Sequence, residues 1–258
     1  MRIEYTLKVE AEYHIGSGLT QPGLADETIV RRHDGQLFIP AEYFRGLLRD
    51  CCTQILYWTG NYKFCCDAAL YKAPVEGEMV QSSVTKTCGL NYRVNEAPCV
   101  LCRIFVTTFA KKSYRFSDAE FEKFDCGDEE FEPVPISTHN RIDPATGRVP
   151  QDLLFTFELG KPAIFKGYIE RVEPFPKTEL LLEEFGLIIA GLRLIERIGK
   201  RSARGWGWAY VDQISLALRG GLKDELPVQV KDSPEDWRVW LKAFLLGGDE
   251  SEMVASEG

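Results

Sequence analysis

Apolar and polar side chains alternate along the first fifteen residues of the chain. Apolar side chains occupy every second position from Ile3 to Tyr13, and mostly charged side chains stand between them. A period of two over this length predicts a half-buried strand over residues 2–15. The glycine-rich stretch 14–27 is typical of a loop. It leads into a short predicted strand over 28–31.

Three segments show helical periodicity instead. Pro40 opens the first, at a position where its missing N–H costs nothing, and apolar residues continue at helical spacing to Leu56. The second helix is predicted over 180–198, which is heavily apolar. The third begins at the capping sequence 233–236. Its apolar stripe, which includes Trp240, is expected to pack on the chain's own core, and packing on another subunit is the alternative.

The remaining pattern is that of strands and loops. Segment 133–160 predicts a long hairpin, because 143–147 has the residues of a turn and the apolar positions after it alternate. A further strand is expected at 163–171, and another follows the segment Gly199–Trp208. Segment 60–105 holds most of the cysteines and little periodicity, which indicates an insertion shaped by something other than a core.

Strands interleaved with two main helices predict an α+β fold of ferredoxin type. Sheets of this type are a common scaffold of RNA-binding proteins. We expect one domain over residues 1–218, which includes the insertion at about 60–105 and the hairpin at 133–160. Residues 219–258 would add a C-terminal helix and an acidic tail that we expect to be disordered.

The net charge of −8 over 258 residues is unusual for a protein that binds nucleic acid. The acidity is concentrated in two segments. Residues 117–132 carry eight acids and one lysine, and residues 223–258 carry nine acids and four basic residues, so the rest of the chain is net positive. Binding of phosphate depends on local positive clusters rather than on the sum. The composition therefore allows an RNA-binding surface.

Neither a membrane segment nor a secretory signal is visible in the sequence. No apolar run reaches the roughly 18 residues that a membrane helix needs, and the N-terminus lacks the pattern of a signal peptide. We therefore expect a cytoplasmic protein without membrane contact. Eight cysteines would be surprising as disulfides in a reducing compartment, so their clustering favours a metal site.

The segment Gly199–Trp208 combines three glycines with Lys200, Arg201 and Arg204. Glycines let a backbone approach a polyanion closely, and the three cations would neutralise phosphates. Its two tryptophans would either stack on bases or belong to the core of the next strand. A solvated loop with scattered charge explains the same segment equally well.

The cysteines suggest structural zinc. Cys99 and Cys102 have the CxxC spacing of a metal knuckle, and Cys88 lies eleven residues before Cys99. Tetrahedral zinc needs four thiolate or imidazole ligands. The expected set is Cys66, Cys88, Cys99 and Cys102, with Cys65, Cys51, Cys52 and Cys126 as alternatives for the fourth ligand. Buried thiols or a redox pair would explain the same residues, although the latter expects a βαβ context.

A few polar residues are candidates for chemistry or RNA contact. Asp26 lies in the glycine-rich loop, where an Asp is more often a turn or cap residue than a catalyst. His139 stands beside Arg141 in the predicted hairpin and is the histidine best placed to touch a ligand. Arg45 and Arg49, four residues apart, line one flank of the first helix. The chain has no Walker loop and no dinucleotide fingerprint.

Read together, these segments resemble the RAMP superfamily of CRISPR proteins, and within it the repeating backbone subunit of type III effector complexes. The loop with Asp26 is similar to the family's glycine-rich loop ahead of a strand. Residues 38–49 resemble its "IPGSSLKGxLR" helix start, and 99–105 resemble its "CxxCRLFG" zinc segment. Residues 141–158 are similar to its "IDRxTG…E" hairpin, and 204–207 to its C-terminal glycine-rich loop.

The resemblance implies a ferredoxin-like core, or modified RRM, that wraps guide CRISPR RNA in a filament with other effector subunits. The hairpin would act as a thumb between guide and target RNA, beside which nucleotides flip out. Asp26 would cut the target RNA with Mg²⁺ or Mn²⁺, which makes the chain an endoribonuclease. The residues implied to contact RNA are Arg45, Arg49, His139, Arg141, Lys200, Arg201 and Arg204. The cysteine-rich insertion points to type III-D or III-E-like systems.

Two other interpretations remain at this point. The same subunit could be a scaffold that binds guide RNA without cutting. Alternatively, the chain could be an unrelated RNA-binding module held together by zinc, with no guide RNA. Mutation of Asp26 separates the first from the catalytic interpretation, and co-purification of a short RNA of defined length separates the second.

Overall fold

A computed structural model shows how these segments are arranged. It describes residues 1–20, 25–59, 99–105, 113–125, 135–140, 142–149, 154–172, 178–217 and, with gaps at 231 and 234, 230–245. Within these ranges the chain has an α+β architecture with antiparallel sheets, which confirms the α+β part of the prediction.

One sheet forms the body of the protein. Its strands are β1 (Arg2–Val9), β2 (Phe38–Ile39), β3 (Tyr114–Phe116), β4 (Ala119–Phe124), β7 (Ala163–Arg171) and β8 (Ala209–Ala217). They follow the order β2-β4-β7-β1-β8, with β3 also paired to β7, and neighbouring strands are antiparallel. β1, the first strand in sequence, therefore lies between two strands from the second half of the chain.

The alternation in β1 separates a buried face from an open face. Ile3, Leu7 and Val9 have no exposed surface. The regular strand ends at Val9 rather than at residue 15. Beyond that point the backbone forms single contacts with different segments. The N–H of Glu10 donates to the carbonyl of Trp208, Tyr13 pairs with Gly160, and the carbonyl of Ile15 accepts the N–H of Val30. The period of two continues, but the chain divides its hydrogen bonds among several partners.

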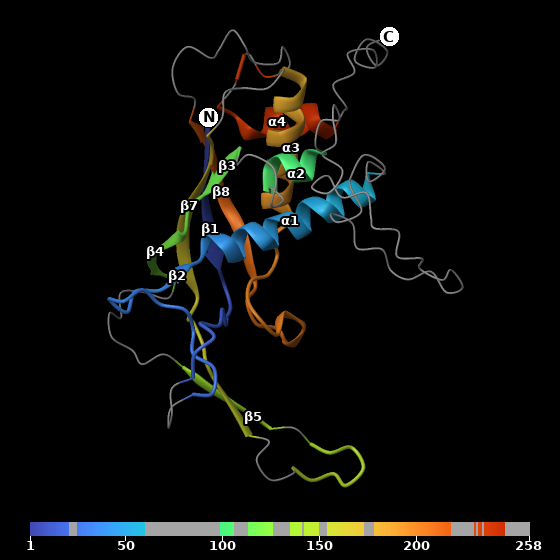
Figure 1. The fold of residues 1–258 in the computed structure, drawn as a ribbon. Helices are drawn as coiled ribbons and strands as arrows, with labels where there is room; N and C mark the ends of the chain where they lie inside the picture. Colours follow the sequence, from blue (N-terminus) through green and yellow to red (C-terminus); the bar gives the residue numbers. More distant parts are fainter. Residues whose placement is uncertain are drawn as a thin grey trace, which may run out of the picture.

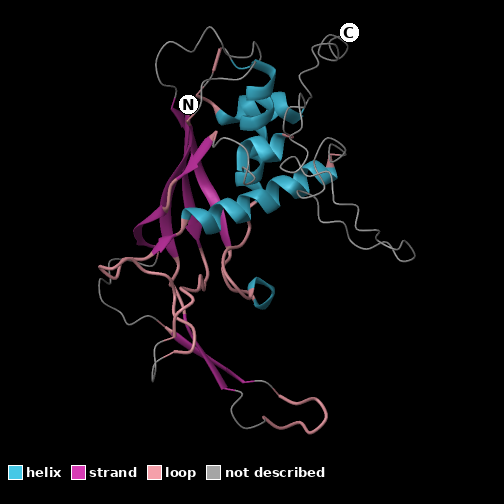
Figure 2. Cartoon of the chain, viewed as in Figure 1, coloured by secondary structure: helices cyan, strands magenta, loops and turns pink. Residues whose placement is uncertain are grey.

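The helices cover one face of this sheet and leave the other open (Figures 1 and 2). They are α1 (Ala41–Trp58), α2 (Val100–Phe105), α3 (Thr178–Leu194) and α4 (Trp237–Leu245). α1 begins directly after Pro40, as predicted. Trp240 of α4 is fully buried and contacts Phe185 of α3, with 5.5 Å between ring centroids. The C-terminal helix thus packs on the chain's own core, as expected.

α3 is shorter than its apolar pattern predicts. It ends at Leu194 rather than at 198, because the next residues form hydrogen bonds outside the helix. The N–H of Ile198 donates to the carbonyl of Gly207, and the N–H of Ala209 donates to Glu196. Residues 195–198 thus run back alongside the start of β8, and the apolar side chains that extended the pattern are buried in this connection.

The end of the cysteine-rich segment belongs to the core. All of α2 except Arg103 is buried, so the view that residues 60–105 lack core contacts is wrong for 100–105. Arg103 donates through Nε to the buried Glu184 of α3 at 2.8 Å, and Arg171 and Tyr114 also donate to Glu184. These contacts fix α2 against α3 and the sheet edge. Residues 60–98 lie outside the described part.

The predicted hairpin is present and projects beyond the end of the sheet (Figure 1). It consists of β5 (Ile136–Asn140) and β6 (Leu154–Glu158), paired antiparallel. Its tip has the expected turn chemistry. Asp143 accepts the N–H of Ala145 and the hydroxyl of Thr146 through its carboxylate, and Gly147 adopts a φ of 67°.

Candidate nucleic-acid interface

Three segments far apart in the sequence meet at the base of the hairpin. The loop before β2 runs beside β6, where Glu27 pairs with Phe157. The connection between α3 and β8 approaches the same strand from another side, where the rings of Trp206 and Phe157 lie 6.1 Å apart. The structure therefore brings Asp26, His139, Lys200 and Arg201, which come from three separate motifs, into one region.

Asp26 is held by a single residue of β6. Its Oδ2 accepts the backbone N–H of Thr156 at 2.7 Å and the hydroxyl of Thr156 at 2.9 Å. The backbone N–H of Asp26 donates in turn to the carbonyl of Thr156 at 3.0 Å. The side chain is exposed, and among the described residues no partner is found for its other oxygen, Oδ1. One carboxylate oxygen is fixed, and the other faces outward.

These contacts also set the protonation of Asp26. The backbone hydrogen bond from Thr156, and then its hydroxyl, hold the pKa of Asp26 below the usual value for an aspartate. The carboxylate is therefore ionised at neutral pH. It can accept a proton transiently, orient a hydroxyl or bind a cation.

Glu27, the next residue, faces the other way. Its Oε2 lies 3.3 Å from Nε2 of the fully buried His14 and forms an ion pair with Nζ of Lys200. The hydrogen bond from Lys200 lowers the pKa of Glu27. A side chain at Gly16 would crowd this group, because a Cβ there would lie 3.1 Å from His14 Nε2. Glu27 is a site residue that sequence reasoning missed.

Glu158 connects the loop to the hairpin. Its Oε2 accepts the N–H of Ile29 at 2.9 Å, and its Oε1 accepts Arg31 at 2.7 Å. The backbone N–H of Glu158 donates to the carbonyl of Glu27 at 3.0 Å. The glutamate that ends the hairpin motif is thus a structural clamp on the Asp26 loop. It could have been inferred from an acid at the end of a strand that is otherwise apolar except for Thr156.

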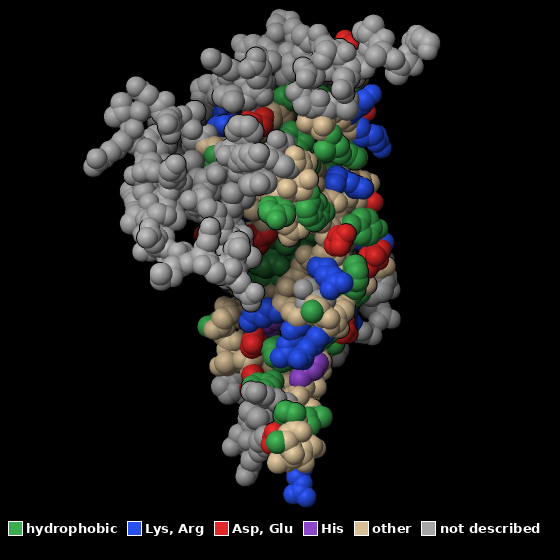
Figure 3. Space-filling model, turned by 90° about the vertical axis from the view of Figure 1, so that its right-hand side faces the viewer, with side chains coloured by type: hydrophobic (Ala, Val, Ile, Leu, Met, Phe, Trp, Pro, Cys, Tyr) green, Lys and Arg blue, Asp and Glu red, His purple; other side chains and the backbone are tan. Residues whose placement is uncertain are grey.

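An aromatic and cationic cluster forms on the side of β6 that faces Glu27. The guanidinium of Arg201 lies over the ring of Phe157, 3.9 Å from its centroid. His139 and Trp206 stand beside it, with 5.3 Å between their ring centroids. Desolvation and the charges of Arg201 and Arg204 lower the pKa of His139. Figure 3 shows Lys and Arg side chains gathered around a histidine above the hairpin.

The glycines of 199–208 serve the fold more than a ligand. Gly199 has a φ of 80°, and a Cβ there would lie 2.6 Å from the carbonyl oxygen of His14. A Cβ at Gly207 would clash with the backbone of Ile198. Tyr43 of α1 accepts the N–H of Gly199 through its hydroxyl at 2.5 Å. Only Gly205, at a φ of 90° with open space around it, leaves room for a polyanion to approach.

The other expected RNA contacts lie elsewhere or outside the described residues. Arg45 donates to the backbone carbonyl of Phe105 and so ties α1 to α2 rather than to the hairpin. Arg49 is half-buried one turn further along α1. Arg204 is exposed at the end of the short 3-10 turn Ser202–Arg204. Arg141 lies outside the described part of the chain.

Only some of the expected zinc ligands lie within the described residues. Cys99 is half-buried, and Cys102, one helical turn on, is buried in α2. Cys66, Cys88, Cys65 and Cys126 lie outside the described residues. Within the described ranges no group of three or more His, Cys, Asp or Glu side chains could hold a metal. Two cysteines one turn apart fit half of a tetrahedral site.

Cys51 and Cys52 are poor alternatives for the fourth ligand. Burial raises the pKa of Cys51 to about 11 and raises that of Cys52 as well. The thiol of Cys52 donates to the carbonyl of Leu187 at 3.4 Å. Zinc is bound by thiolates, and formation of a thiolate is costly at both positions. Their role is to fill the core between α1 and α3.

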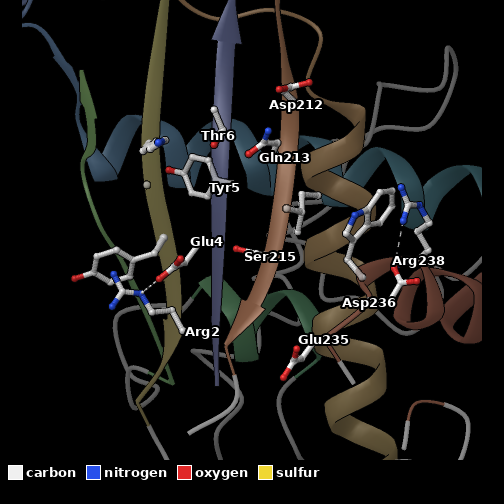
Figure 4. Close-up of a pocket in the computed structure, with 15 residues that line it drawn as sticks. Arg2, Glu4, Tyr5, Thr6, Asp212, Gln213, Ser215, Glu235, Asp236 and Arg238 are labelled. Atoms are coloured by element: carbon white, nitrogen blue, oxygen red, sulfur yellow. Dashed lines mark hydrogen bonds and ion pairs between the residues drawn. The ribbon is translucent and has the colours of Figure 1, made fainter. Parts of the chain in front are cut away.

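A sizeable hollow lies away from Asp26. It has a volume of about 870 Å³ and covers the open face of the sheet next to α4 (Figure 4). Its lining mixes the acids Asp212, Glu235 and Asp236 with Arg2 and Arg238. This balance of charge does not favour a polyanion.

In the described part of the chain, no helix is long and apolar enough to cross a membrane.

The comparisons with known proteins agree with the geometry. A family model of the RAMP superfamily matches residues 6–210, from within β1 into β8, and includes Asp26, the hairpin and the 199–208 loop. No curated protein matches the chain. RAMP proteins are RNA-binding subunits that act with other subunits in CRISPR complexes. The match covers most of the sequence, and the chain therefore belongs to the RAMP superfamily.

Proposed function

We propose that this chain is a repeating backbone subunit of a type III CRISPR effector, which holds guide RNA and cuts complementary target RNA at Asp26. The observation that carries the proposal is the position of Asp26, exposed and ionised at the base of a projecting hairpin, with the Arg201 cluster on the other side of the same strand. Family membership excludes the interpretation as an unrelated zinc-held module.

The sheet order supports a ferredoxin-like core. The strands β4, β7, β1 and β8 are adjacent and antiparallel, and α1 and α3 follow β1 and β7 in the chain. This is the order of a βαββαβ unit in which β4 and β7 are the two consecutive strands in the middle of the chain order. The hairpin then lies between two core strands in sequence, where it can act as a thumb between guide and target RNA.

The two sides of the hairpin base suggest how the work is divided. Arg201, Lys200 and Arg204 carry the positive charge that a guide backbone needs. On the other side, Oδ1 of Asp26 is available to orient the 2′-hydroxyl of a flipped nucleotide towards its neighbouring phosphate. A divalent metal ion, held by Asp26 and the RNA, would supply charge stabilisation at that phosphate. Thr156 would keep the carboxylate in position.

The catalytic part of the proposal is tested with Asp26→Ala in the assembled complex. We expect the rate of target cleavage opposite this subunit to fall by about 10²- to 10⁴-fold, with unchanged binding of guide RNA. Asp143→Ala is a matched control, because Asp143 is another aspartate with a lowered pKa, half-buried at the hairpin tip. Cleavage that persists in Asp26→Ala would leave the subunit as a non-catalytic scaffold.

A structural zinc ion completes the proposal, and the cysteine-rich insertion favours a type III-D or III-E-like system. Cys99 and Cys102 would bind the ion together with Cys66 and Cys88. We expect about one zinc per chain by elemental analysis, lost in the double variant Cys99→Ser with Cys102→Ser. Cys52→Ser is the control and should keep its zinc. A folded wild-type protein without zinc would refute this part.

A further inference from the structure

Two large aromatic side chains are exposed on the open face of the sheet, beside the glycine-rich loop. Trp208 is 44% exposed and Tyr210 is 37% exposed. Gly207 and Ala209, which alternate with them, are buried, so both rings point away from the helices. β8 stands at the end of the strand order, which leaves the rings at the edge of the sheet.

Cations accompany both rings. Arg197 is paired with Trp208 across the short ladder before β8, and its guanidinium lies 4.1 Å from the ring centroid. Lys8 of β1 is the register partner of Tyr210. Lys8 also forms ion pairs with Asp125 and Glu10. Single exposed apolar residues are ordinary, but this is a row of two rings with a stacked arginine.

We propose that Trp208 and Tyr210 form a stacking platform for unpaired bases of RNA. Outward positions on one strand are about 6.6 to 7 Å apart, a spacing that suits successive bases of an extended single strand. Aromatic side chains on an open sheet are a known way to stack two or three bases. Arg197 and the Lys200–Arg204 loop that follows would meet the phosphates of the same strand.

The platform is separate from the hairpin site. Trp206 turns towards His139 and Phe157, whereas Trp208 turns towards Arg197 on the open face. Gly207, which lies between the two tryptophans, has a positive φ of 72°, and this turn of the backbone sends their side chains to different sides. The inference rests on the proposed RNA-binding function and adds a second contact with RNA. This contact would be independent of the nucleotide sequence, because every base has an aromatic face that can stack on a ring.

The test uses the full-length chain and measures fluorescence anisotropy of a labelled twelve-nucleotide oligouridylate and of an RNA duplex. Trp208→Leu should weaken binding of the single strand by about 5- to 150-fold, which corresponds to one stacked base. Binding of the duplex should not change. Trp208→Phe should keep most of the affinity. Trp58→Leu is the matched control, since Trp58 is 66% exposed at the far end of α1.

The outcomes distinguish the stacking platform from the proposed function and from contact with another protein copy. If the wild-type chain binds single-stranded RNA and Trp208→Leu binds it equally well, the platform is wrong and the proposed function stands. If the wild-type chain binds no RNA, both fail. If Trp208→Leu changes the sedimentation of the protein without RNA, while Trp58→Leu does not, the rings contact another protein copy and the platform is overturned.

Discussion

The two faces of strand β6 differ in what they hold and in how they hold it. On one face, Thr156 and Glu158 fix the Asp26 loop through directed hydrogen bonds to a carboxylate and to backbone groups. On the other face, Phe157 gathers Arg201, His14 and Trp206 through ring contacts. Because neighbouring residues of a strand point to opposite sides, a single step along the chain separates the acid from the cations.

The same separation occurs in the partner segment. Asp26 turns to Thr156, whereas Glu27 turns to His14 and Lys200. An approaching polyanion is attracted on one side of the hairpin and meets an ionised carboxylate on the other. The position of the Asp26 carboxylate is therefore set by hydrogen bonds on one face of the strand. The position of the Arg201 cation is set by ring packing on the other face.

The largest effect is expected from loss of Phe157, which anchors the cationic face. Phe157 is 4% exposed, and Phe157→Ala should lower the free energy of unfolding by about 3–5 kcal/mol. Urea denaturation followed by circular dichroism measures this. Phe155→Ala, at an exposed position of the same strand, should cost far less. Equal losses in the two variants would mean that the ring cluster does not anchor the hairpin.

A smaller effect, of opposite sign, is expected at Glu27. Its carboxylate neutralises Lys200, so Glu27→Gln should free a cation for phosphate and raise the affinity for single-stranded RNA by up to about fivefold. Both side chains are well exposed, which keeps the effect small. Glu12→Gln removes the same charge from an exposed position nearby and is the control. A weaker affinity in Glu27→Gln would show that the ion pair positions Lys200 instead.

An effect of similar size is expected at Thr156. Thr156→Val removes the hydroxyl that donates to Asp26, so the pKa of Asp26 should rise towards its ordinary value, as measured by NMR titration. Cleavage should fall by about threefold to tenfold, the worth of one hydrogen bond. Thr138→Val, at the cross-strand partner position, is the control. An unchanged pKa of Asp26 in Thr156→Val would show that the backbone N–H of Thr156 alone lowers this pKa.

The pH dependence follows from the sign of this shift. The folded-state pKa of Asp26 lies below the unfolded value, so its carboxylate stabilises the folded chain at pH above the unfolded value. That contribution is lost as the pH falls through the lowered pKa. In Thr156→Val this contribution should be smaller, and its loss should be complete at a higher pH than in the wild type.

Local patterns predicted most of the elements. The strand over 163–171 and the start of α1 at Pro40 follow from periodicity and from proline chemistry alone. β3 and β4 were not predicted, because β4 lies in an acidic segment whose exposed charges hide its buried positions. The end of α3 was missed as well, since Ile195 and Ile198 are buried by a returning loop rather than by a helix.

The candidate site shows the same division. The sequence by itself determined the local motifs, and their resemblance to the RAMP superfamily implied that Asp26, His139 and the Lys200–Arg204 segment contribute to one RNA-binding subunit. Only the tertiary structure decided that Asp26 and Glu27 face opposite sides, that Arg45 turns to α2, and that Gly199 and Gly207 make room for the chain itself. Periodicity reports which positions are buried, whereas partners across more than a hundred residues are chosen by backbone pairing and side-chain fit in three dimensions.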